Sequence, residues 1–108
     1  MSGLSNLTNS FNLKASGRGL TQPADEGTLD LQGRDSAVLV ADNAATFKLP
    51  KAPEGTVVYV VAQANVTVTD VAGSDLDVDV DTREVGIFIC SNSNGTWAGV
   101  LAKDAELS

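Results

Sequence analysis

Short stretches in which apolar and polar residues alternate, or apolar residues run together, recur along most of the chain. Within residues 65–70, Val66 and Val68 lie in one phase and two threonines in the other, as in a strand with one buried face. Residues 56–61 form the strongest apolar run and are rich in β-branched side chains, which predicts a buried strand. The candidate strands are residues 28–31, 37–41, 45–49, 56–61, 65–70, 75–81, 85–90 and 96–101.

The spacing of these candidate strands predicts the fold class. They recur roughly every 8–12 residues, and no helical pattern of about 12 residues separates them. Turn-forming residues lie between them, such as the segment from Pro50 to Gly55 and the Asn94-Gly95 pair. The sequence therefore predicts an all-β domain, either a small sandwich or a barrel.

The first 24 residues have a different character. They are rich in Ser, Asn, Gly and Thr, and Gly17, Gly19 and Pro23 interrupt any regular element. This composition disfavours an isolated helix. We expect residues 1–24 to form an extended arm that becomes ordered on a partner, followed by a β-domain over residues 25–108. The alternative is a frayed terminus.

Charge is distributed unevenly over these two parts. The chain has 7 Lys and Arg and 14 Asp and Glu, for a net charge of −7. Lys14 and Arg18 give the arm +2, and residues 25–108 carry 5 − 14 = −9. We expect no nucleic-acid partner, because phosphate binding needs clustered positive charge. We also expect no membrane partner, since no apolar run approaches the roughly 20 residues that cross a bilayer. The first residues lack a signal-peptide pattern, which indicates synthesis in a cytoplasm.

Composition also limits the chemistry. The chain has no histidine and one cysteine, Cys90. A Ser-His-Asp or Cys-His nucleophile therefore cannot be built within it, nor a zinc site of several Cys and His ligands. Cys90 ends an apolar strand and is expected to be an inert, buried side chain. We predict no catalytic residue, metal or cofactor. A carboxylate-based enzyme is the weakest alternative, because nothing pairs two acids with a cleft.

Four aspartates alternate with apolar residues in the sixth candidate strand. On a strand they would share one face and form a carboxylate ladder, while Leu76, Val78 and Val80 face the core. A helix–loop–helix calcium loop starting at the first aspartate would need Gly and Glu where Val80 and Gly86 stand. In-line carboxylates about 7 Å apart also lie too far apart to share one ion unaided. We interpret the ladder as a solvated or edge face that discourages misassociation. Its members are Asp75, Asp77, Asp79 and Asp81.

Three segments carry a resemblance to a known class of proteins. Residues 45–61 combine a strand ending in Leu-Pro with a Pro/Gly connection and a valine-rich strand. Residues 66–69 form a Thr/Val strand, and residues 86–97 an apolar strand, an Asn-Gly turn and Thr-Trp. This pattern resembles β-modules in virion proteins of tailed bacteriophages, which include head fibres, tail-fibre segments and capsid decoration (cement) proteins.

The size of the chain and the order of its two parts indicate which members of this class it resembles most. A fibre needs a long shaft of repeats or coiled coil, which this chain lacks. A compact acidic β-domain after an acid-free arm is similar to capsid decoration proteins, which implies a homotrimer on the outer capsid surface, bound to the major capsid protein and stabilising the head. An arm can add a strand to a neighbour's sheet, and three subunits multiply its contacts. The expected arm contacts are Leu4, Leu7, Phe11, Leu13, Lys14 and Arg18.

Aromatic residues separate this hypothesis from its main rival. Phe47 and Phe88 lie in the core phase of their strands, and we expect them, with Tyr59 and Trp97, to form the core or a subunit interface. The rival is a receptor- or carbohydrate-binding module of a virion fibre or adhesin, in which Trp97 or Tyr59 stacks on a sugar. If the virion hypothesis is wrong, the chain is an all-β interaction domain.

Overall fold

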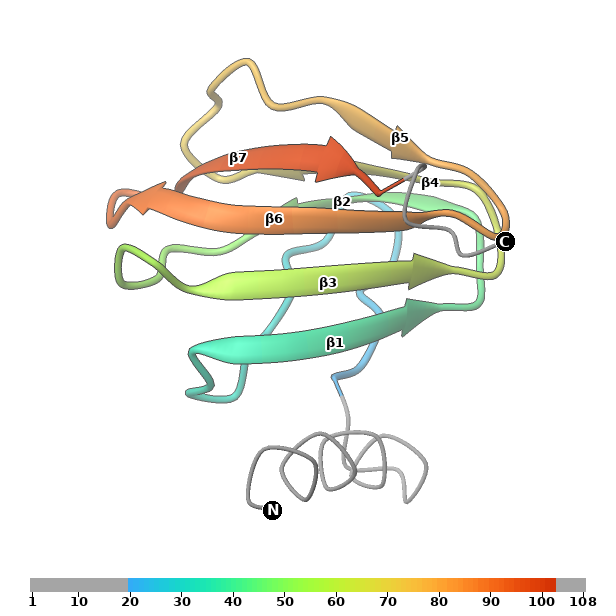
Figure 1. The fold of residues 1–108 in the computed structure, drawn as a ribbon, viewed down its shortest axis with the longest axis horizontal. Coiled ribbons are helices and arrows are strands. Elements are labelled where there is room, and N and C mark those ends of the chain that lie inside the picture. Colours follow the sequence, from blue (N-terminus) through green and yellow to red (C-terminus); the bar gives the residue numbers. More distant parts are fainter. Residues whose placement is uncertain (1–19, 103–108) are drawn as a thin grey trace.

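Seven strands form in the computed structural model, which describes residues 20–102 of the chain (Figure 1). Because each carries either alternating or β-branched apolar residues, each can turn one face towards a common core. This confirms the all-β prediction. The strands are β1 (Ser36–Ala41), β2 (Ala45–Leu49), β3 (Val57–Ala62), β4 (Val66–Asp70), β5 (Val78–Val80), β6 (Val85–Asn92) and β7 (Thr96–Leu101).

Two sheets pack face to face as a sandwich. One has four strands in the order β1-β3-β6-β7, and the other has three in the order β2-β4-β5. From β1 to β4 the chain changes sheet at every connection, so β1 pairs in parallel with β3, and β2 pairs in parallel with β4. The remaining pairs are antiparallel. The four-stranded sheet is the nearer layer in Figure 1.

Two predicted strands differ in the structure. Residues 28–31 form no strand. Thr28 makes one isolated parallel bridge to Lys48, and the chain then turns because Asp30 accepts a hydrogen bond from the Gln32 amide at 2.8 Å. The predicted strand over residues 75–81 shortens to Val78–Val80. Its first half belongs to the loop that follows β4, which begins with a turn where the Gly73 amide bonds to the Asp70 carbonyl.

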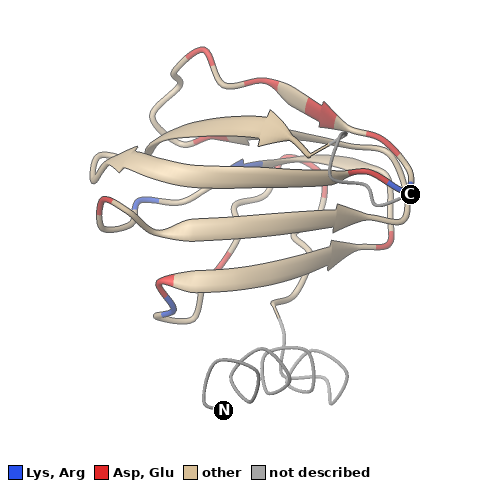
Figure 2. Cartoon of the chain, in the orientation of Figure 1, with Lys and Arg blue, Asp and Glu red and all other residues tan. Residues whose placement is uncertain are grey.

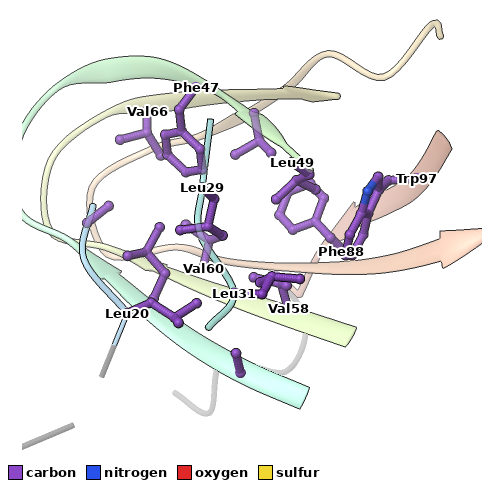
Figure 3. Close-up of a cluster of buried hydrophobic side chains, with 14 of the residues drawn as sticks. Leu20, Leu29, Leu31, Phe47, Leu49, Val58, Val60, Val66, Phe88 and Trp97 are labelled. Carbon is purple, nitrogen blue, oxygen red and sulfur yellow. The ribbon is translucent and has the colours of Figure 1, made fainter. Parts of the chain in front are cut away.

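The core lies between the two sheets (Figure 3). Phe47 of β2 and Phe88 of β6 are fully buried there. Gly86 and Gly99 leave the space that the Phe88 ring fills, because a Cβ at either position would overlap that ring. The other large core side chains come from both sheets and from the segment before β1, and include Leu20, Leu29, Leu31, Leu39, Leu49, Val58, Val60, Val66, Val68, Val80 and Trp97.

The segment before β1 is part of the β-domain. Leu20, at the start of the described residues, is 5% exposed. The Gln22 side chain accepts hydrogen bonds from the Asp42 and Asn43 amides and donates one to the Asn43 carbonyl. Further along, the amide of Leu29 bonds to the Lys48 carbonyl at 2.9 Å. The segment that begins at Leu20, whose first residues the sequence assigns to the arm, therefore packs on the domain.

Candidate interaction surface

Apolar side chains line the outward side of the four-stranded sheet. Successive side chains of a strand point to opposite faces, so the residues between the core positions of these strands point away from the sandwich. The strand register places them in rows across the sheet, one of which is Val38, Tyr59, Ile87 and Val100. We call this surface the outer face; its apolar residues are Val38, Val40, Val57, Tyr59, Val61, Val85, Ile87, Ile89, Ala98 and Val100.

The outer face is accessible to solvent. Tyr59 is 39% exposed, Ile89 47% and Val100 61%, and Ala98 is also exposed. Among the described large hydrophobic residues, the remaining exposed one is Val71, which lies beyond β4. Four strands about 4.8 Å apart and six residues rising about 3.3 Å each give the face a footprint on the order of 400 Å². Apolar patches of about this size on a protein surface are often functional.

No charged residue interrupts this surface. The sequences of β1, β3, β6 and β7 contain no Asp, Glu, Lys or Arg. Figure 2 shows these strands in tan; the charged residues of the described part lie outside the strands or on the three-stranded sheet, where Lys48 is on β2, Asp70 on β4 and Asp79 on β5. Since the whole chain has a net charge of −7, the outer face is a neutral area on an acidic protein. Such a surface suits contact with another protein, because desolvating it removes no charge from water.

Here the structure departs from the sequence prediction. The apolar run over residues 56–61 predicts a buried strand, and residues 85–90 predict a hydrophobic one. In the structure each run turns alternate residues into the core and the others outward, so that Val58 is buried while Tyr59 is exposed. The difference arises because the three-stranded sheet covers one side of the four-stranded sheet.

The structure separates the four aromatic residues proposed for the core or a subunit interface. Phe47, Phe88 and Trp97 lie in the core, and Tyr59 lies on the outer face. Trp97 is 3% exposed, and its indole N–H donates a hydrogen bond to the Pro50 carbonyl at 2.8 Å. In this position Trp97 cannot stack on a sugar. Of the two aromatic residues named for carbohydrate binding, Tyr59 is the accessible one.

The six predicted arm contacts lie outside the described residues. They are Leu4, Leu7, Phe11, Leu13, Lys14 and Arg18, all within residues 1–19. The structure therefore places none of them relative to the outer face, and their role stays a prediction.

The carboxylate ladder is solvent-exposed along its length, while the residues between its members are half-buried or buried. This agrees with the predicted phase, although β5 holds just one of the four aspartates. Asp79 accepts a hydrogen bond from the Thr67 hydroxyl of β4 at 2.8 Å. Within residues 20–102 no cluster of three or more His, Cys, Asp or Glu side chains is arranged to hold a metal ion.

A buried carboxylate that the sequence analysis did not single out joins the two sheets. Asp70, the last residue of β4, is 3% exposed. Its side chain accepts hydrogen bonds from the Ser74 amide and hydroxyl and, at 2.9 Å, from the amide of Trp97 on β7. The signal was present in the sequence, since Asp70 continues the inward phase of Val66 and Val68. A charged residue in a core phase indicates a structural hydrogen-bond acceptor.

Two further features of the β-domain do not form a binding site. Cys90 is buried, as predicted, and its thiol lies 3.3 Å from the carbonyls of Ala52 and Asn92. An open hollow of about 370 Å³ lies between residues 29–35 and 50–53. No aromatic side chain lines it, so it lacks the stacking platform that sugar-binding clefts use. In residues 20–102 no helix is long and apolar enough to cross a membrane.

Comparison of the chain with family models, with curated proteins and with solved structures finds no match. The candidate site therefore stands on its own geometry. A neutral, apolar sheet face has the properties of a protein-binding surface.

Proposed function

We propose that the chain is a structural capsid decoration (cement) protein of a tailed phage. In this role it binds the outer surface of the major capsid protein shell as a homotrimer and stabilises the head. The observation that carries the proposal is the outer face, a neutral apolar surface on an otherwise acidic β-sandwich. A protein whose work is assembly needs such a surface, and the acidic remainder keeps the particle exterior soluble.

The arm supplies the attachment in this proposal. The acid-free segment carries Lys14 and Arg18 and four large apolar residues, so it can contact the shell through both apolar and charged groups. An extended segment can also pair with the edge of a capsid sheet through its main chain. Leu20 is buried and belongs to the β-domain, so in this proposal the residues that bind the capsid shell lie within residues 1–19.

The test is cosedimentation with capsid shells assembled from the major capsid protein of the same genome. We expect the full chain to pellet with the shells to a saturable stoichiometry and to raise the temperature at which the shells dissociate. Deletion of residues 2–19 should leave the chain folded but in the supernatant, because the deletion spares Leu20 and Gln22. A matched control keeps the arm and carries Asp77→Asn, an exposed change in the loop before β5.

The outcomes separate the parts of the proposal. A full chain that stays in the supernatant at saturating shell concentration would contradict the decoration role. Equal pelleting of the full and truncated chains would retain that role and overturn the arm as its attachment segment.

The exposed Tyr59 supports a second candidate, a receptor- or carbohydrate-binding module of a virion. Its ring lies at 39% exposure on the outer face, where an aromatic side chain can stack on a sugar. Glycan binding that is lost in Tyr59→Ala would favour this candidate over decoration.

A further inference from the structure

Strands β1, β3 and β6 of the four-stranded sheet carry more apolar residues than the core of the sandwich buries. Nearly continuous apolar runs are typical of strands that are covered on both faces, whereas strands with one solvated face alternate between apolar and polar residues. The three-stranded sheet shows that alternation, with Thr67 and Thr69 between the valines of β4. In β3, by contrast, Val57, Tyr59 and Val61 fill the outward positions. The second face of this sheet therefore has the composition of a covered surface.

We propose that the outer face is the surface through which copies of this chain associate, so that in the assembled protein it packs against the outer face of a second copy. Val38, Tyr59, Ile87 and Val100 form the central row of the contact. The inference deepens the proposed function, since it assigns a surface to the trimer proposed there, but it does not depend on attachment to a capsid.

Charge points to a second copy as the occupant. Two copies with a net charge of −7 each repel one another wherever their acidic surfaces meet. Every acidic residue within residues 20–102 lies outside β1, β3, β6 and β7, so contact through the outer face keeps these carboxylates of the two copies apart. An apolar surface without a charge pattern is also complementary to itself.

The size of the face agrees with this occupant. A stable interface buries about 800 Å² on each partner, with an apolar centre and a polar rim. A footprint on the order of 400 Å² from the strand spacings fits the apolar centre. Ser36 of β1 and Thr96 of β7 lie on the same outward side and begin the polar rim.

A trimer can use this face in a defined way. Three sheets turned towards a threefold axis form a triangular core, in which each sheet contacts both neighbours. Val100, on β7, and Val38, on β1, then lie towards opposite neighbours, because β7 and β1 are the outer strands of the sheet. Tyr59 and Ile87, on the two central strands, lie nearest the axis.

The experiment measures the mass of the full chain in solution by sedimentation velocity and light scattering over a dilution series. The variants are Val100→Asp and Ile89→Asp, which place a carboxylate on the outer face at side chains that are 61% and 47% exposed. The control is Val71→Asp, which makes the same change at an exposed valine off the face. We expect a mass three times that of the 11.1 kDa chain for the wild type and the control, falling threefold in the two variants.

Milder substitutions guard against misfolding. Val100→Thr and Ile89→Thr keep a β-branched side chain and replace a methyl or an ethyl group in the contact with a hydroxyl. We therefore expect the dissociation concentration to rise by about tenfold or more while the circular dichroism is unchanged. Val71→Thr is the control and should leave the dissociation concentration unchanged.

Each outcome decides the inference. A wild-type chain that is monomeric at millimolar concentration overturns it. If deletion of residues 2–19 from that monomer increases the binding of a hydrophobic dye, the arm and not a second copy covers the outer face, and the inference is overturned as well. An oligomer that survives all the outer-face variants overturns it as well. A dimer that the outer-face variants dissociate supports the inference and contradicts the trimer of the proposed function. Association through the face without binding to shells supports the inference and contradicts the decoration role.

Discussion

Single residues link the two sheets of the sandwich. Asp70 is the clearest case, because its carboxylate on β4 accepts hydrogen bonds from the Ser74 loop and from the backbone of Trp97 on β7. Trp97 in turn bonds to the Pro50 carbonyl, at the end of β2. Every buried side-chain nitrogen or oxygen in the described residues has a hydrogen-bond partner. The polar groups at this end of the sandwich thus fix how the sheets meet.

At this scale we predict that Asp70→Asn destabilises the protein. One oxygen of the carboxylate accepts bonds from both Ser74 Oγ and the Trp97 amide. The amide of an asparagine would either turn a donor towards these donors or lose the Ser74 amide bond. The expected loss in the free energy of unfolding is about 1–3 kcal/mol, measured by urea denaturation. The control, Asp77→Asn, lies at an exposed position and should change it by less than about 0.5 kcal/mol. Equal effects in the two variants would contradict the structural role of Asp70.

At the scale of elements, the sequence predicts strands well and their surroundings less well. Alternation and β-branching predicted all seven strands, because the direction in which successive side chains point is a local property of the chain. The Asn94-Gly95 pair likewise predicted the turn between β6 and β7. The prediction of a strand at residues 28–31 was wrong, because the Asp30 side chain accepts a hydrogen bond from the Gln32 amide and the chain turns there. Alternation also predicted that Val66 and Val68 face the core, but it says nothing about which strand lies beside β4.

The segment before β1 carries the prediction that belongs to this scale. Deletion of residues 2–19 should change the free energy of unfolding by less than about 0.5 kcal/mol. Deletion of residues 2–24 should lower it by about 2–4 kcal/mol, because it removes buried Leu20 and the three hydrogen bonds of Gln22. Urea denaturation at one fixed protein concentration compares the two. If both deletions cost the same, residues 20–24 do not belong to the β-domain.

At the scale of the whole molecule, charge and apolar surface are segregated. Within residues 20–102 the acidic residues lie outside the strands or on β4 and β5, while the strands that form the outer face carry none (Figure 2). Because of this separation, the salt concentration should change the strength of self-association. Salt screens the repulsion between acidic bodies and leaves an apolar contact intact.

We therefore predict that salt strengthens self-association. Raising NaCl from about 50 mM to about 500 mM shortens the Debye length from roughly 14 Å to roughly 4 Å. Because each copy carries −7, the dissociation concentration should fall. Sedimentation velocity at the two salt concentrations measures it. Dissociation of the wild type by salt would contradict an apolar interface and indicate one built on ion pairs.

The sequence by itself determined the class of fold, the phase of each strand and the acidic character of the domain, because alternation, β-branching and charge are properties of residues and their near neighbours. The tertiary structure decided the strand partners. The parallel pairing of β1 with β3 and of β2 with β4 joins strands separated by a strand of the other sheet, and no local pattern encodes that choice. It also decided which apolar residues are left outside. Val58 and Tyr59 are neighbours in the same apolar run, yet one lies in the core and the other on the outer face, since a two-layer sandwich covers each sheet on one side.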